Sequence, residues 1–218
     1  MNPTEVSQAI RSLTHELIRH GLADRQNLPS IRRAGQETHI SIAGSPDLSM
    51  SFNDVPYADI FDDVLKANAF NFQLIDGSLV QLLYCFNRRN LVSHRLFFLP
   101  DPGTEYFDVA SEIFRDEPLF GDIFAVNSVR TPLRFDYSSS AVKLVDKDHP
   151  RSHLTIGMTP NCRIPTTSPL TPHRFMRFIL RNFYFSAYST LMLDEPANAE
   201  QFPDCISDNE RAIFHCVG

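Results

Sequence analysis

The sequence predicts an α+β fold: one mainly antiparallel sheet of about six strands, with an N-terminal helix and a long C-terminal helix packed on it. Three observations predict this class. Residues 70 to 99 form three β-type runs joined by very short turns, so neighbouring strands must run antiparallel. Residues 5 to 20 carry apolar side chains at helical spacing. A second apolar helix starts at Thr171-Pro172, an N-cap hydroxyl followed by proline.

The N-terminal part of the chain begins with an amphipathic helix. Its N-cap is expected at Thr4 and its end at Gly21, because glycine favours the backbone conformation that closes a helix. The elements expected to follow are a loop at residues 24–35, a strand at 38–43, a turn at 44–47 and a helix at 57–68.

The middle of the chain supplies most of the expected sheet. Asp76-Gly77 is a two-residue turn of the kind that closes a tight hairpin, and Asn87 to Asn90 form the next turn. Strands are expected at residues 70–75, 79–86, 91–99, 132–137, 141–145 and 152–157, and helices at 105–115 and 118–126.

The C-terminal part begins with a crossing loop rich in proline, residues 158 to 170. The long helix that follows is expected to reach about Leu191 and to be apolar almost all round, which predicts burial against the sheet. A capping box at Ser207 to Glu210 predicts a short last helix. Because no repeat or linker divides the chain, residues 1–218 are expected to form a single α+β domain.

Composition and charge exclude several classes of protein. The chain has 218 residues, 43% of them hydrophobic, as in ordinary globular proteins. A net charge of -6 argues against a protein that coats nucleic acid. Four cysteines without paired spacing favour a reducing compartment. We see no signal peptide, no apolar run that could span a bilayer and no cofactor-binding fingerprint, which predicts a cytoplasmic protein without membrane contact or cofactor.

Arginines gather in a part of the chain that lacks acidic residues, from Arg151 to Leu193. Three of them recur on one face of the long helix, whose first turn favours anions through its unpaired N–H groups. Guanidinium groups bind phosphate through paired hydrogen bonds. The candidate anion-binding residues are Arg95, Arg151, Arg163, Arg174, Arg177 and Arg181.

A second interpretation of the same arginines is structural. They then form a solvated stripe or pair with an acidic surface, and these two together are the more frequent outcome for such residues. A third possibility is that an arginine orders the crossing loop. The acidic residues concerned are Asp54, Asp59, Asp62, Asp63, Asp116 and Glu117.

Two histidines, His94 and His153, are the candidate catalytic residues. If their strands are close together, they share a patch with Arg95, Arg134 and Asp136, in which an imidazole beside a carboxylate can act as a base. The alternative is that these are core histidines with satisfied hydrogen bonds, and that Arg134 and Asp136 form an ion pair on one face of a strand.

Two weaker patterns involve histidine. His39 and His153 each begin a segment of histidine, one residue, then a hydroxyl residue, the arrangement of phosphoesterases that use two histidines on facing strands. His149, His153 and Cys162 are ligand types for zinc, but Pro150 and the β pattern argue against the helical spacing that such a site needs. No metal site is therefore assigned.

Six strings of the sequence are long and irregular enough to be distinctive: DGSLVQLLY (76–84), HRLFFLPDP (94–102), PLRFDYS (132–138), HPRSHLTIG (149–157), CRIPTTSPLTP (162–172) and FMRFILRNFY (175–184). They resemble a bacterial family known as a domain of unknown function, DUF2290. The resemblance covers most of residues 70 to 185 and implies an intracellular bacterial origin and one shared domain, but no reaction.

Two functional hypotheses remain, and the sequence does not decide whether the chain is an enzyme. The first is a domain that binds a phosphate, a nucleotide or a nucleic-acid end through the arginines, with phosphodiester chemistry at the histidines as an extension. The second is a non-enzymatic module that binds a protein partner through aromatic residues at 178–188 and 107–124.

Overall fold

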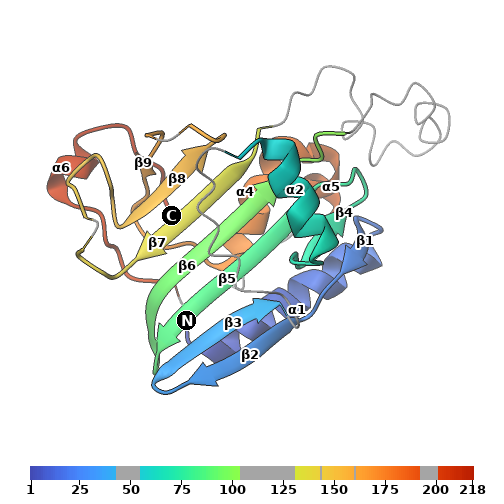
Figure 1. Cartoon of the computed structure of the whole chain (residues 1–218), viewed down its shortest axis with the longest axis horizontal. Helices are drawn as coiled ribbons and strands as arrows, with labels where there is room; N and C mark the ends of the chain where they lie inside the picture. Colours follow the sequence, from blue (N-terminus) through green and yellow to red (C-terminus); the bar gives the residue numbers. More distant parts are fainter. Residues whose placement is uncertain (43–54, 104–130, 143, 160, 192–200) are drawn as a thin grey trace.

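A nine-stranded sheet forms the centre of the computed structural model, which describes residues 1–42, 55–103, 131–142, 144–159, 161–191 and 201–218. All pairs of named strands are antiparallel, and helices lie on both faces of the sheet (Figure 1). The expected α+β class is confirmed, with more strands than the sequence predicted. The turn expected at 44–47 and the helices expected at 105–115 and 118–126 lie outside the described residues.

Helix α1 (Pro3–Arg19) begins earlier than predicted: its N-cap is Asn2, and Thr4 is already inside the helix. The Asn2 side-chain oxygen accepts hydrogen bonds from the backbone N–H groups of Thr4 (2.9 Å) and Glu5 (3.2 Å). The Glu5 carboxylate in turn accepts from the Asn2 N–H at 2.8 Å, which completes a capping box. Gly21 follows the helix with a φ of 67°, as a closing glycine should.

Strands β1 (Ala23–Gln26) and β2 (Pro29–Ala34) replace the loop expected at residues 24–35, so that prediction was wrong. β1 pairs with β4, and β2 pairs with β3 (Glu37–Ile42). Most residues of β1 and β2 are exposed. An exposed edge strand needs no alternation of apolar and polar residues, and this alternation is the signal by which a sequence reveals a strand.

The predicted meander is confirmed as β4 (Phe72–Leu74), β5 (Leu79–Asn87) and β6 (Asn90–Leu99). Gly77 has a φ of 83° in the first turn, and Arg88 has a φ of 58° in the second. β5 lies in the middle of the sheet, with β6 on one side and both β3 and β4 on the other.

Strands β7 (Leu133–Ser138), β8 (Ser152–Ile156) and β9 (Ile164–Pro165) extend the sheet beyond β6. The crossing loop therefore contributes a two-residue strand. The strand expected at 141–145 is not formed by the described residues there, where Val142 is 91% exposed and Val145 makes only an isolated bridge to His149.

The predicted long helix is two helices, α4 (Pro172–Phe183) and α5 (Phe185–Leu191), separated at Tyr184. The Thr171 side chain caps α4 by accepting from the Arg174 N–H at 3.2 Å, as predicted. The expectation of an apolar surface all round is wrong for α4, because Arg177 and Arg181 are exposed. Its buried residues are Pro172, Phe175, Met176, Ile179 and Leu180.

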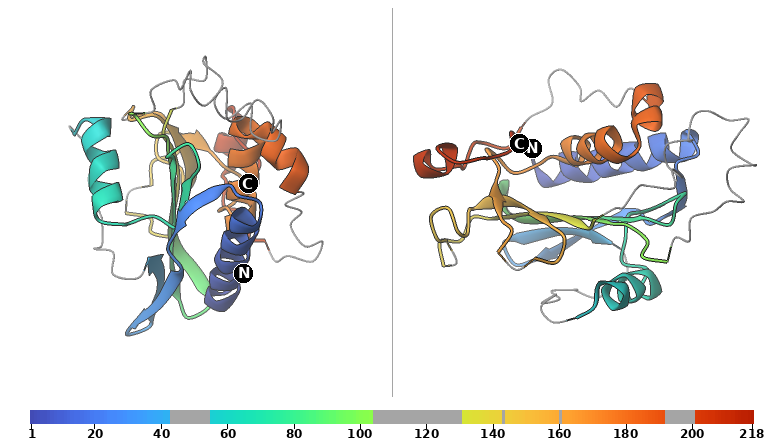
Figure 2. Two further views of the ribbon diagram at one scale, coloured as in Figure 1. Left: turned by 90° about the vertical axis from the view of Figure 1, so that its right-hand side faces the viewer. Right: turned by 90° about the horizontal axis from the view of Figure 1, so that it is seen from above.

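The helices form two unequal layers. α1 and α4 cover one face of the sheet, and α2 (Tyr57–Lys66) covers one end of the other face (Figure 2). The larger hydrophobic core lies under α1 and α4, and a smaller one lies under α2. The last helix, α6 (Asp208–Arg211), starts at the predicted capping box. Among the described residues, no helix combines the length and the apolar character needed to cross a membrane.

Candidate functional site

The alternation of side chains along β6, β7 and β8 assigns the polar residues to faces. Arg95 lies opposite Asp136, and Asp136 lies opposite His153. Directly opposed residues on neighbouring strands point to the same face. Asp136 adjoins Phe135, whose ring packs against Phe175 of α4 with centroids 5.9 Å apart. Arg95, Asp136 and His153 therefore point away from α4, onto the face that α2 covers only in part.

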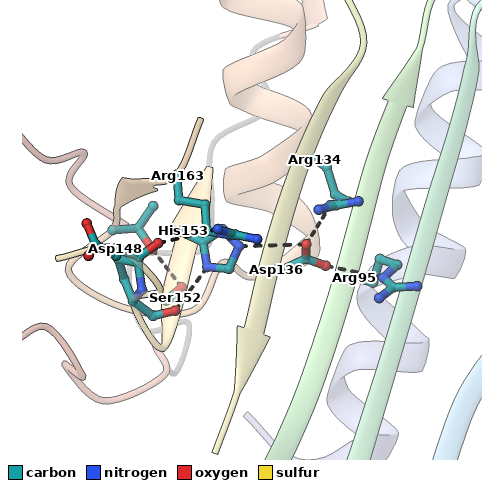
Figure 3. Close-up of polar contacts among 9 residues, drawn as sticks. Arg95, Arg134, Asp136, Asp148, Ser152, His153 and Arg163 are labelled. Carbon is teal, nitrogen blue, oxygen red and sulfur yellow. Dashed lines mark hydrogen bonds and ion pairs between the residues drawn. The ribbon is translucent and has the colours of Figure 1, made fainter. Parts of the chain in front are cut away.

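Asp136 is the centre of this polar group. Its Oδ1 lies 3.2 Å from Nε of Arg95, and its Oδ2 lies 2.5 Å from Nε of Arg134 (Figure 3). The guanidinium of Arg134 also lies over the Phe97 ring, 5.8 Å from its centroid. The expected ion pair between Arg134 and Asp136 is thus present, and Arg95 from the next strand joins it.

His153 is buried beside Asp136 in a defined tautomer. Its Nδ1 lies 3.0 Å from the Pro150 carbonyl oxygen, which can only accept, so Nδ1 carries the proton. Nε2 lies 3.9 Å from Oδ2 of Asp136. Burial lowers the pKa of His153 to about 4, although the Asp136 carboxylate acts in the opposite direction. At neutral pH the ring is uncharged and Nε2 presents a lone pair.

A cavity of about 750 Å³ occupies this face, and we call it the open-face cleft. Arg163 reaches it from the segment before β9, beside the His153 ring, with its NH1 3.4 Å from the Asp148 carbonyl oxygen (Figure 3). Arg151 lines it from the start of β8. Four arginines and one aspartate line the cleft, and the excess of positive charge suits an anion. The charged lining residues are Arg95, Arg134, Asp136, Arg151 and Arg163.

The side chain of His94 points to the opposite face of the sheet from that of His153, although both residues are among those that line the open-face cleft. It stands opposite Tyr137, whose strand neighbour Asp136 points into the cleft. His94 is 3% exposed, and its Nε2 accepts a hydrogen bond from the Leu170 N–H at 3.1 Å. Burial lowers its pKa to about 4. These contacts fit the alternative of a core histidine, which here fixes the end of the crossing loop just before α4, although within the described residues only Nε2, and not Nδ1, has a hydrogen-bond partner.

The arginines of α4 also lie away from the cleft. Arg177 and Arg181 are exposed on the helical layer, and Arg174 donates a hydrogen bond to the Gly218 carbonyl oxygen. The six candidate anion-binding arginines therefore divide into two groups. Arg95, Arg151 and Arg163 line the open-face cleft, while Arg174, Arg177 and Arg181 belong to the opposite layer.

The acidic residues proposed as partners of these arginines are only partly described. Asp62 on α2 pairs with Lys66 at 3.0 Å, on the other side of the sheet from α4. In the described part of the chain, Arg177 and Arg181 make no ion pair with α2. Asp54, Asp116 and Glu117 lie outside the described residues.

A second group of polar side chains stands at the β3–β5 end of the open-face cleft. His39 lies opposite Cys85, and Glu37 lies two residues before His39 on the same face. Oε2 of Glu37 is 3.2 Å from Nε2 of His39. Burial raises the pKa of the Cys85 thiol, and the Glu37 carboxylate raises it further. Sequence reasoning named His39 but missed Glu37 and Cys85, because only the strand register brings Cys85 to the other two.

The two weaker histidine patterns do not form compact sites. His39 and His153 both line the cleft, but three strands separate β3 from β8, a span of roughly 19 Å at the usual strand spacing. That span is too wide for both imidazoles to hold one phosphate. The His149 and His153 rings are 5.2 Å apart, but within the described residues they do not converge with Cys162 into a three-ligand group.

The aromatic residues proposed to contact a protein partner differ in how exposed they are. Phe178 is half-buried, and its ring packs on Phe135 with centroids 5.4 Å apart. Phe185 is 62% exposed and lies beside Tyr188. The Phe-rich stretch at 107–124 lies outside the described residues.

Comparison with known proteins yields one match. A family model described as an uncharacterized conserved protein, DUF2290, matches residues 22–217. The match extends well beyond the stretch on which the sequence resemblance was based and includes both β3 and the cleft residues of β6 to β9. No curated protein and no solved structure matches the chain.

Proposed function

We propose that this chain, which belongs to the DUF2290 family of uncharacterised conserved proteins, binds the phosphate of a nucleotide or of a nucleic-acid end in the open-face cleft. One observation carries the proposal. Arg95 and Arg134, from neighbouring strands, pair with the single carboxylate of Asp136, and Arg163 lines the same cavity, on a face that no described helix covers at that point.

The geometry of the two ion pairs supports a phosphate as the ligand. Both contacts of Asp136 are made by Nε atoms, one from Arg95 and one from Arg134. A guanidinium carries five N–H donors, so within the described residues these pairs leave the outer nitrogens available for a ligand. Paired N–H groups at fixed orientation match two phosphate oxygens. Asp136 then orients the arginines, and the ligand receives their outer donors.

The charge of the whole chain limits the size of the ligand. With a net charge of -6, the body of the protein repels a long polyanion. The lining of the open-face cleft carries four arginines and one aspartate, a local positive excess on an acidic chain. A mononucleotide or a chain end, which brings few phosphates, fits this distribution better than a long duplex laid across the surface.

His153 extends the proposal to phosphodiester chemistry. Its neutral ring presents a lone pair on Nε2, 3.9 Å from the Asp136 oxygen that pairs with Arg134. A ring in this state accepts a proton from an attacking hydroxyl or water. In this role His153 acts alone, because His94 is on the other face. Replacing His153 with Gln is then expected to abolish turnover while ligand binding persists.

The test is a binding panel on the full-length chain. Nucleotides, cyclic phosphates, short RNA and DNA, and inorganic phosphate are compared by thermal shift and calorimetry. A ligand present at 100 times its dissociation constant stabilises the native state by about 2.7 kcal/mol. The variant Arg95→Ala with Arg163→Ala is expected to lose this stabilisation. Its matched control, Arg177→Ala with Arg181→Ala, removes the same charge from the opposite layer and is expected to keep it.

Two results contradict the proposal. One is a panel in which no ligand shifts the unfolding temperature, and the other is equal loss of binding in both double variants. Either result favours the alternative of a non-enzymatic module that binds a protein partner, for which exposed Phe185 is the described anchor.

Four free cysteines support the further proposal that the protein works in the reducing cytoplasm.

A further inference from the structure

Three metal-ligand side chains meet at one end of the open-face cleft. Glu37 and His39 come from β3, and Cys85 comes from the neighbouring β5. One ligand atom from each lies within 4.8 Å of the other two. In the described part of the chain, these three residues form the group that brings a thiol, an imidazole and a carboxylate together.

The arrangement follows from the strands and not from flexible segments. His39 and Cys85 are directly opposed in the β3–β5 ladder, and the i, i+2 spacing puts Glu37 on the same face as His39. Opposed side chains start about 5 Å apart, which lets their tips share one small ion. The Glu37 carboxylate contacts both the His39 imidazole and the Cys85 thiol, so the three side chains turn toward one point.

The donor types select the kind of metal. Thiolate and imidazole disfavour Mg²⁺ and Ca²⁺, which prefer oxygen ligands. Zn²⁺ takes sulfur, nitrogen and carboxylate oxygen together in a tetrahedral arrangement. Three protein ligands leave one position of the tetrahedron open, which is the pattern of reactive zinc sites and not of closed structural ones.

We propose that Glu37, His39 and Cys85 bind one Zn²⁺ ion, with the fourth coordination position open to the cleft. His39 and Cys85 line the same cavity as Arg95. The register puts Leu83 opposite Arg95, so Cys85 and Arg95 are diagonal neighbours, roughly 7–8 Å apart at the backbone. A water or anion on the open position therefore lies within reach of the cleft arginines, of which Arg95 is the nearest in the strand register. Metal binding itself does not depend on the proposed phosphate binding.

The experiment uses the full-length chain, stripped with a chelator and kept reduced, and titrated with Co²⁺ as a spectroscopic substitute for Zn²⁺. We expect one equivalent to bind, with a near-ultraviolet thiolate-to-metal band that Zn²⁺ removes by displacement. Cys85→Ser is expected to lose the band. Glu37→Gln and His39→Gln are expected to weaken Zn²⁺ binding by roughly tenfold or more. The control Cys162→Ser, a half-buried cysteine outside the group, is expected to keep the wild-type spectrum.

Native mass spectrometry of the same proteins provides a second readout, because it counts ions per chain. Circular dichroism of each variant verifies that it has folded, which is expected since Glu37 and His39 are substantially exposed. The proposal is overturned if the folded wild-type chain takes up no Co²⁺ or Zn²⁺. It is equally overturned if Cys85→Ser retains the thiolate band, because another cysteine is then the ligand.

Discussion

At the scale of single residues, Asp136 balances the charge of the open-face cleft. It is mostly buried, accepts a hydrogen bond from Arg95 and forms an ion pair with Arg134, and without it the two guanidinium groups would face each other without compensation. Like charges in such proximity repel, and partly buried guanidinium groups lose hydration that only a carboxylate replaces.

Asp136→Asn is expected to lower the free energy of unfolding by about 2 kcal/mol, the range of a hydrogen bond to a charged group. Urea denaturation measures the loss. The control is Asp62→Asn, which breaks the exposed pair with Lys66 and is expected to cost at most about 0.5 kcal/mol. Equal effects of the two substitutions would show that Asp136 has no special role in the balance.

His94 and His153 make the stability of the native state depend on pH. Burial lowers the pKa of each to about 4, from an ordinary value of 6.5. At pH values between about 4 and 6.5, both imidazoles bind protons in the unfolded chain but remain neutral in the native state. Stability therefore falls as the pH is lowered from 6.5 toward 4, and the two histidines contribute nothing to this slope above that window.

His94→Gln is expected to flatten the slope by about 1.4 kcal/mol per pH unit within the window. Glutamine retains an acceptor for the Leu170 N–H, so the fold should survive. Unfolding free energies measured at several pH values give the slope. His153→Gln should flatten it by a similar amount, and slopes identical to that of the wild type would refute the assignment of neutral rings.

Sequence reasoning at this scale succeeded where the chain's own alternation decides. The i, i+2 spacing of Arg134 and Asp136 implied one face and an ion pair, and both are present. It failed where register decides. Whether His94 or Arg95 faces Asp136 depends on how β6 slides against β7, and one step moves every side chain to the other face.

At the scale of elements, local signals predicted the helices better than the edge strands. The two capping residues Thr171 and Ser207 were identified from sequence alone and both are confirmed. The single long helix was wrong because Tyr184 leaves helical geometry, and its buried hydroxyl donates to Asp76 at 2.9 Å. A tertiary hydrogen bond between residues so far apart in sequence leaves no periodic signal.

The start of α1 offers a clean test of the corrected cap. Asn2→Ala removes an acceptor that satisfies two backbone N–H groups and is expected to cost about 1 kcal/mol of stability. Thr4→Ala, at the position that the sequence had suggested, removes no capping bond and should cost clearly less. Thermal or urea unfolding of both variants measures the two losses of stability and so identifies the capping residue. A larger loss for Thr4→Ala would restore the original prediction.

At the scale of the whole molecule, the sheet separates packing from chemistry. The face under α1 and α4 carries most of the apolar core, including the aromatic contacts of Phe98 and Phe135. The opposite face carries the arginine group and the Glu37, His39 and Cys85 cluster. The family match spans both faces, from residue 22 to 217. Substitutions of cleft residues should therefore change ligand binding more than they change the free energy of unfolding.

The same organisation predicts an order of local stability. β5 and β6 are paired along both edges and contribute buried residues to both cores, so their amides should exchange with solvent only through global unfolding. β2 pairs with β3 alone and is largely exposed, so it can open locally. Hydrogen–deuterium exchange read by mass spectrometry is expected to show slow exchange for peptides covering 79–99 and much faster exchange for 29–34. Comparable protection of the two would mean that the β2–β3 hairpin unfolds only together with the central sheet, and the edge would then be as stable as the centre.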